Sequence, residues 1–91
     1  MDSKDVERIS KALSDPHRIR IMQEVKIRGV VPCSDICGMI DLAQPSVSHH
    51  LKQLTDAGLL VPQKEGRSIR YTIDTDVIAA YSRFLSTLTT A

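Results

Sequence analysis

The segment from Leu42 to Leu60 limits the possible folds of this chain more than any other, because it predicts an amphipathic helix with a sharp end. Val47, Leu51 and Leu54 recur at helical spacing and give that helix one apolar side. Gly58 can end the helix, and an apolar run typical of a strand follows it. The segment therefore predicts a helix that packs by one side and then leads into a sheet.

The opposite side of this helix is polar. Counted at ~100° per residue from Val47, the outward positions carry imidazole, amide, ammonium and hydroxyl groups near the helix start. Such groups hydrogen-bond to base edges and phosphates in the major groove of DNA. A solvated surface helix shows the same pattern, so this helix alone leaves both interpretations open. The outward residues are Pro45, His49, Lys52, Gln53 and Asp56, with Ser46 and Ser48 beside them.

A shorter helix is predicted just before it. Ser34 is a good N-cap residue, and Asp35 in the first turn would suit the helix dipole. This helix would run to about Ile40, and residues 41–44 would then connect it to the next helix. Two helices joined so tightly, the second with a polar start, predict a helix-turn-helix over about residues 34–57.

A β-hairpin is predicted after this unit. Two alternating runs, Leu59–Lys64 and Ser68–Ile73, flank a turn that contains Gly66. A basic hairpin alone is usually only a solvated turn. Directly after a helix-turn-helix it predicts a wing, over about residues 59–73, that contacts phosphates or a minor groove. The basic residues of this wing are Lys64, Arg67 and Arg70.

Helices are also predicted at both ends of the chain, over about residues 3–14, 16–28 and 76–88. In the second of these, Ile19 is expected to face the core and Arg18 to face solvent. Together these elements predict a single winged helix-turn-helix domain over residues 1–91. It would be mainly helical, with the element order ααααββα.

The last helix carries a broad apolar stripe with two of the three aromatic residues. It either covers its own domain or pairs with the first helix and with the same helices of a second copy. Two-fold pairing would hold two reading helices roughly 34 Å apart, one turn of DNA. The candidate residues of such a homodimer interface are Val6, Ile9, Leu13, Val77, Ile78, Tyr81, Phe84, Leu85 and Leu88.

The composition allows DNA binding without a strong overall charge. The net charge is only +1, but residues 46–72 hold four basic residues against two acidic ones. No apolar run approaches the ~18 residues that span a bilayer, and charges interrupt the N-terminus, so we expect a cytoplasmic protein without a membrane partner. Two cysteines fit a reducing compartment. No nucleophile–base pair, carboxylate pair or phosphate-binding loop is apparent, so an enzyme is not expected.

Three motifs resemble those of the ArsR/SmtB family of bacterial metal- and stress-responsive repressors, and together they cover nearly the whole chain. The resemblance implies a homodimeric winged-helix repressor that binds an inverted repeat in double-stranded operator DNA. It also implies release when an inducer binds or a thiol is oxidised. The motifs are residues 12–22 as the family's opening, residues 44–54 as its recognition helix, and residues 58–60 with Gly66, Arg67 and Tyr71 as its strand entry and wing.

The resemblance also assigns roles to single residues. His50 matches a frequent family residue, but its angle lies nearer the core side, which indicates packing. His17 is expected to be a solvated residue at a helix start. Ala43 stands where the family often has a capping serine, which predicts the loss of ~0.5–2 kcal/mol of helix capping. The positions that match DNA contacts in the family are Gln44, Ser46, Ser48 and His49, with Arg67 at the wing tip.

Cys33 and Cys37 lie four residues apart at the start of the predicted third helix. Arsenic-responsive members of the family carry a cysteine cluster in this region, but only Cys37 aligns with it. With Ser34 as the cap, Cys37 would lie in the first turn, where the dipole favours a thiolate, and Cys33 just outside. The pair could bind arsenite or another thiophilic metal(loid), or form a disulfide. Alternatively, both are small buried hydrophobic residues.

The favoured function is a sequence-specific repressor that leaves its operator when an inducer acts at the two thiols, with no cofactor required. Two alternatives stay open. One is a winged-helix regulator with inert thiols and no metal response. The other is a protein-interaction module that uses the last helix and has no role on DNA.

Overall fold

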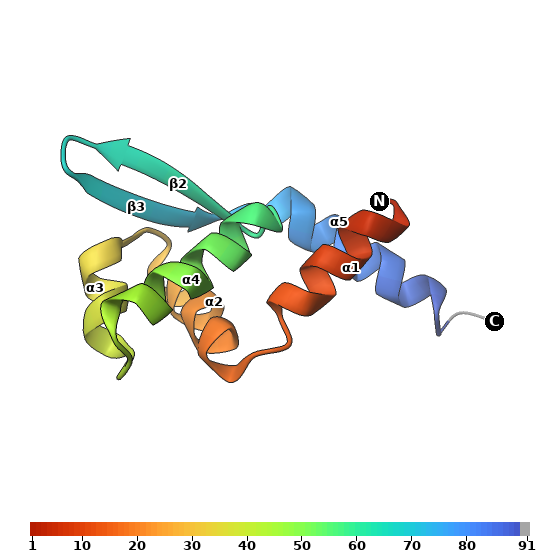
Figure 1. Ribbon diagram of the computed structural model, residues 1–91. Coiled ribbons are helices and arrows are strands. Elements are labelled where there is room, and N and C mark those ends of the chain that lie inside the picture. The colour runs from red at the N-terminus through yellow and green to blue at the C-terminus, as the bar shows by residue number, and fades with distance from the viewer. Residues whose placement is uncertain (90–91) are drawn as a thin grey trace.

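The computed structural model describes residues 1–89, which form five helices and three strands (Figure 1). This order confirms the winged helix-turn-helix predicted from the sequence and adds one short strand. The elements in chain order are α1 (Ser3–Ala12), α2 (Pro16–Arg28), β1 (Val31–Pro32), α3 (Cys33–Met39), α4 (Gln44–Asp56), β2 (Leu60–Glu65), β3 (Ser68–Ile73) and α5 (Thr75–Thr87).

Local side-chain chemistry sets several helix boundaries. The carboxylate of Asp15 accepts hydrogen bonds from the amides of His17 and Arg18, at 2.9 and 3.1 Å, and so caps the start of α2. Asp74 caps α5 in the same way, through two amides at 3.1 and 3.2 Å. Gly29 ends α2 with a φ of 84°, which glycine adopts without steric cost.

The three strands form an antiparallel sheet in the order β1-β3-β2, so β3 is the central strand. Tyr71 on β3 lies opposite Val31 on one side and Pro62 on the other. No strand is predicted from the sequence for the segment Val31–Pro32. It pairs as a strand because Val31 is fully buried and its partner Tyr71 is part of the core.

The core lies between the helices and the inner face of the sheet. Val47, Leu51 and Leu54 all enter it, which confirms the apolar side predicted for α4. They pack with buried side chains from every other element except α5. The remaining members of this core are Ile9, Ala12, Ile21, Met22, Val25, Val31, Ile36, Ile40, Leu59, Leu60 and Tyr71.

Two expectations for α2 are wrong. Ile19 is 37% exposed, and Ile21 is fully buried in its place. The buried face of α2 is centred between Ile21 and Val25, which turns Ile19 to the side. Arg18 does not face solvent freely, because its guanidinium bonds to the main chain at the end of α1.

The molecule is elongated, with principal dimensions of 47 × 23 × 22 Å. α1 and α5 lie at one end of it, whereas α3 and the tip of the β2–β3 hairpin lie at the other (Figure 1). No residue of α5 is fully buried. The Tyr81 hydroxyl and the Ser10 hydroxyl share a hydrogen bond of 2.8 Å that ties α5 to α1. Within residues 1–89, no helix has the length and apolar character needed to cross a bilayer.

Candidate nucleic-acid interface

The start of α4 lacks a side-chain cap. Ala43 occupies the N-cap position, and no side chain bonds to the first amides of the helix. Its carbonyl oxygen accepts from the amides of Ser46 and Val47, at 3.0 and 3.2 Å. The sequence predicted that α4 would lack a capping hydroxyl group, and the structure agrees.

The polar face predicted on α4 is open to solvent. Gln44, Ser46, Ser48, His49 and Lys52 are all exposed, whereas Val47 between them is buried. The ammonium of Lys52 forms an ion pair with Asp56 at 2.9 Å, and the Nε2 of Gln53 lies 3.5 Å from the Nε2 of His49. The face thus offers hydroxyl and amide groups near the helix start and a partly neutralised lysine further along.

The wing is exposed and carries a small excess of positive charge. Lys64, Arg67 and Arg70 are all exposed, as predicted, but Arg70 forms an ion pair with Glu65 at 3.0 Å. Within the described part of the chain, Lys64 and Arg67 form no ion pair. These two side chains are therefore the cations that the wing can present to a phosphate without first breaking a contact.

The polar face of α4, which we call the reading face, lies at the same end of the molecule as the wing. The start of α4 and the tip of the hairpin both lie away from α1 and α5 (Figure 1). Gly66 sits at this tip with a φ of 59°, which favours glycine and permits the tight turn. The fold therefore presents a polar helix start and a basic hairpin at the same end.

Two histidines beside this face are partly buried. The side chain of His50 is only 12% exposed, which agrees with a packing role. His17, which was expected to be solvated, is half-buried, and its ring lies 5.6 Å from the ring of His50. The α2 start and α4 therefore meet through these two rings.

The cysteines differ from expectation in their place on α3. Pro32 is the N-cap and Ser34 lies inside the helix, so the predicted serine cap is wrong. The backbone at Pro32 is extended, and α3 begins at Cys33, two residues earlier than it would with Ser34 as the cap. Cys33 is consequently the first helical residue, and Cys37 lies one turn later, past the first turn.

Both thiols are free and half-buried. Burial raises the pKa of Cys33, and the adjacent Cys37 raises it further through its charge and a hydrogen bond. Burial also raises the pKa of Tyr71, with smaller contributions from the charges of both cysteines. The site therefore favours the protonated thiol of Cys33 at rest, while Cys37 lies past the first turn in which the helix dipole was expected to act on it.

No group of three potential ligands (His, Cys, Asp or Glu) that could hold a metal ion is found among residues 1–89. The two thiols alone would have to provide the protein ligands of a soft ion at α3.

Apolar side chains line the exposed side of α5. Ile78, Leu85 and Leu88 are 37%, 44% and 69% exposed. The rings of Tyr81 and Phe84 stack with their centroids 6.4 Å apart. Of the predicted interface residues, Val6, Leu13, Val77, Tyr81 and Phe84 are partly exposed.

Ile9 is a correction to this set. Its side chain is only 1% exposed and belongs to the core of its own chain. The reason is that α1 packs on α4 by the side that carries Ile9, so this residue is not available to a second copy.

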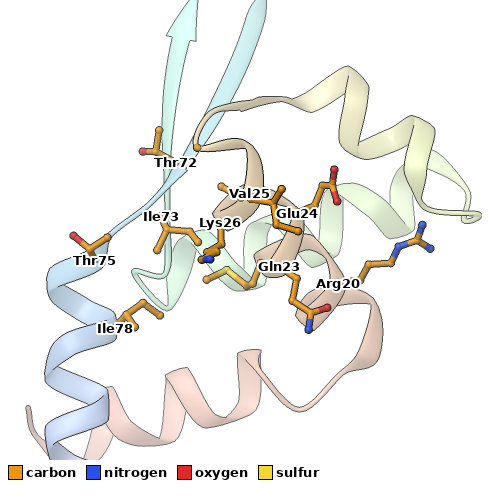
Figure 2. A pocket seen from close by; sticks show the side chains of 12 residues that line it. Arg20, Gln23, Glu24, Val25, Lys26, Thr72, Ile73, Thr75 and Ile78 are labelled. Atoms are coloured by element: carbon orange, nitrogen blue, oxygen red, sulfur yellow. The ribbon is translucent and has the colours of Figure 1, made fainter.

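An open groove of about 910 Å³ lies between α2 and the start of α5. Figure 2 shows Lys26 of α2 directed toward Ile73, whereas Arg20 and Glu24 of the same helix are directed away from Ile73 and Ile78. Ile78 belongs both to this groove and to the exposed stripe of α5. The two apolar surfaces are therefore continuous.

An exposed polar helix start, a preceding short helix and a basic hairpin define a winged helix-turn-helix regulator. The family model described as a helix-turn-helix domain matches residues 13–63. The transcriptional repressor SdpR of Bacillus subtilis is 34% identical over 77% of this chain and 77% of its own length. The chain belongs to the ArsR/SmtB family of winged helix-turn-helix transcriptional regulators.

Other relatives have names that refer to metals. A cadmium resistance regulatory protein, the CadC homolog of Staphylococcus aureus, is 33% identical over 77% of this chain. An arsenical resistance operon repressor of Staphylococcus xylosus is 29% identical over the whole chain and 86% of its own length. The match spans only 58% of the CadC homolog. These relatives are named as regulators and not as enzymes.

Solved structures show the same fold. The crystal structure of an ArsR family transcriptional regulator, 26% identical, superposes over 98% of this chain and 91% of its own with a TM-score of 0.89. A homodimeric winged helix-turn-helix DNA-binding domain from Mycobacterium bovis, 23% identical, superposes over 94% of this chain and 80% of its own with a TM-score of 0.74. The second likeness concerns the fold alone.

Proposed function

We propose that this protein is a cytoplasmic, sequence-specific transcriptional repressor that binds double-stranded operator DNA as a homodimer. The observation that carries the proposal is the exposed polar start of α4, which shares one end of the molecule with a basic wing. Ser46, Ser48 and His49 would read base edges in the major groove. Lys64 and Arg67 would hold phosphates, which fixes the register of the helix on the duplex.

The apolar side of α5 supports the homodimer. A small domain that leaves Leu85 and Leu88 exposed has a surface that a second copy can bury. In a two-fold arrangement each copy would bring the same surface, and the two α4 helices would enter successive major grooves. The operator would then be an inverted repeat with half-sites roughly one DNA turn apart.

Selection of bound DNA from a random library, followed by gel shifts over a salt series, tests this proposal. We expect a selected inverted repeat, with affinity that falls steeply as salt is raised. A chain without sequence-selective, salt-dependent binding would instead be a protein-interaction module.

We further propose that Cys33 and Cys37 receive the inducer, and that a soft metal(loid) such as arsenite suits them better than oxidation. Helical residues four apart have Cβ atoms ~5–6 Å apart, whereas a disulfide needs roughly 3.5–4.5 Å. A disulfide would therefore unwind the start of α3. When arsenous acid binds both thiols, two As–S bonds replace two As–OH bonds, and each hydroxyl group leaves as water with one thiol proton; this needs less movement than a disulfide. The cadmium and arsenical resistance names of two relatives support this choice.

Release of the chain from operator DNA, titrated with arsenite, zinc or peroxide, separates these chemistries. We expect arsenite to release wild-type protein and to have no effect on a variant with Cys33→Ser and Cys37→Ser. Release by peroxide alone would favour oxidation. If no reagent distinguishes the two proteins, the thiols are inert and the signal acts elsewhere.

A further inference from the structure

Arg18 joins three segments of the fold at one point. Its Nε donates to the carbonyl oxygen of Ala12 at 2.6 Å, and its Nη2 donates to that of Lys11 at 3.1 Å, both at the end of α1. Its Nη1 lies 3.1 Å from Nδ1 of His50 on α4. One side chain of α2 therefore connects the end of α1 to the helix that carries the reading face.

The partner of Arg18 on α4 lies next to the reading face but does not belong to it. His50 follows the exposed His49 and Ser48 directly, yet only 12% of its own side chain is exposed. Its Nδ1 also lies 3.8 Å from the Asp15 carboxylate that caps α2. A change at His50 would thus reach the reading helix without touching DNA.

The chemistry of this contact requires a neutral imidazole. An arginine side chain has only donors, so Nδ1 of His50 must accept, and the proton of the neutral ring must be on Nε2. A protonated ring donates from both nitrogens and cannot accept from Arg18. Its Nδ1–H would then face Asp15, and the link from α4 to the end of α1 would be lost.

The surroundings favour the neutral ring at rest. Burial lowers the pKa of His50 below its usual 6.5; the Asp15 carboxylate opposes this shift, and Arg18, His17 and His49 add to it. From α1, the groups at this junction are the two carbonyl oxygens bonded by Arg18. For Asp15, burial alone would raise the pKa, but the amide of Arg18 and the neighbouring charges outweigh it and lower the value.

We propose that Arg18 and His50 form a positioning pair that fixes α4 against the end of α1 and releases it when His50 is protonated. Neither residue contacts DNA in this scheme. Acidification would weaken specific operator binding through the angle of α4, independently of the thiols on α3. The consequence for DNA rests on the proposed function, but the pair itself can be tested without DNA.

The first test uses the free chain of residues 1–91 without DNA. Imidazole ¹⁵N NMR should show His50 as the Nε2–H tautomer near neutral pH, and its ring should titrate below 6.5. Arg18→Lys, which keeps the charge but loses the planar fork, should shift the Nδ1 resonance. An Nδ1–H tautomer, or a ring that titrates above 6.5, would overturn the pair.

A second measurement without DNA compares wild type with His50→Asn. The asparagine side-chain oxygen can replace Nδ1 as an acceptor but does not titrate. Because the folded pKa of His50 is depressed, its contribution is complete above 6.5 and is lost as the pH falls below that value. The difference in unfolding free energy between the two proteins should be level above 6.5 and should favour His50→Asn below it. A level difference throughout would contradict the proposal.

The third measurement follows operator affinity at constant ionic strength between about pH 5.5 and 7.5. Wild type should lose roughly tenfold to a hundredfold relative to His50→Asn on acidification, as expected when a charge-assisted hydrogen bond is lost. His50→Leu should show that loss at every pH, and non-specific binding should be equal in all three. His49→Gln should bind more weakly but keep the pH step.

The outcomes separate the two proposals. A pH step that disappears in His49→Gln and remains in His50→Asn would assign the effect to the reading face and overturn the positioning pair. If the chain binds no operator at any pH, the proposed function fails, and the NMR and unfolding measurements still decide whether the pair exists.

Discussion

At the residue scale, the candidate interface divides between groups that read bases and groups that hold phosphates. Ser48 and His49 lie on the exposed side of α4 and present short hydrogen-bonding side chains. Arg67 lies at the hairpin tip with no ion pair among the described residues, whereas Arg70 is occupied by Glu65. This division predicts different losses of affinity from the two places.

Replacing a reading residue should reduce specificity, and replacing a wing residue should reduce affinity in general. Ser48→Ala and His49→Ala should weaken binding to the operator more than binding to random DNA. Arg67→Ala should weaken both about equally and lower the salt slope by about 0.9. Gel shifts at several salt concentrations measure all three quantities. Equal losses for the three variants would mean that the reading face is wrongly assigned.

The uncapped start of α4 offers a stabilising substitution. Ala43→Ser should add a hydroxyl that accepts from the amide of Ser46, because the N-cap backbone is already extended. We expect a gain of about 0.5–1 kcal/mol in unfolding free energy, measured by urea denaturation. Ala43→Val, which offers no acceptor, is the matched control and should give no such gain. A similar gain from valine would point to packing and not to capping.

At the scale of elements, the sequence predicted nearly all helices and the hairpin, because their apolar periodicity and their caps agree. The carboxylates of Asp15 and Asp74 cap the starts of α2 and α5. The sequence did not predict β1, because a two-residue strand depends on its pairing with Tyr71 and has no periodicity of its own. Nor could it place the start of α3, where the backbone fixed by Pro32 outweighs the capping preference of Ser34.

The candidate site was less predictable than the fold. Exposure of the α4 face followed directly from the apolar period set by Val47. Tertiary contacts decided the rest, and no local pattern carries them. Arg18 turned inward because the carbonyl oxygens of Lys11 and Ala12 at the end of α1 lie within its reach. Sequence spacing alone shows an arginine on the polar side of a helix, which is ordinarily solvated.

Substitutions at Gly66 test how strongly the conformation of this one residue determines the shape of the hairpin turn. Gly66 has a φ of 59°, and a Cβ added there would meet nothing within 4 Å. Gly66→Ala should therefore destabilise the protein by about 1–2 kcal/mol through backbone strain alone. Gly66→Asn should cost less, because asparagine tolerates this conformation better. Thermal unfolding compares the two, and an equal cost would indicate that the turn changes its shape.

At the scale of the whole molecule, the fold is elongated, and α5 lies at one end of it. α5 has no fully buried residue, and its contact with α1 includes the hydrogen bond between Tyr81 and Ser10. The stripe of exposed apolar residues on α5 continues into the groove against α2 through Ile78. In the proposed homodimer, a second copy of the chain covers this apolar surface.

Dimerisation should fail when a charge is placed in the stripe. Leu85→Glu should raise the dimer dissociation constant by on the order of a hundredfold, because the substitution occurs twice in a two-fold interface. Val30→Glu is the matched control, since Val30 is 46% exposed after the end of α2 and does not line the groove that continues the stripe. Analytical ultracentrifugation measures both. Equal dissociation constants for Leu85→Glu and wild type would place the interface elsewhere.

The loosely attached C-terminal helix makes the survival of the molecule depend on how much of it is present. At low abundance, single copies would leave α5 open to proteases, since few contacts hold it against its own chain. A clipped copy would keep its wing and reading helix but could no longer pair. Low abundance of the protein would then speed the degradation of the remaining copies, so a cell could clear the last of this regulator without a dedicated signal.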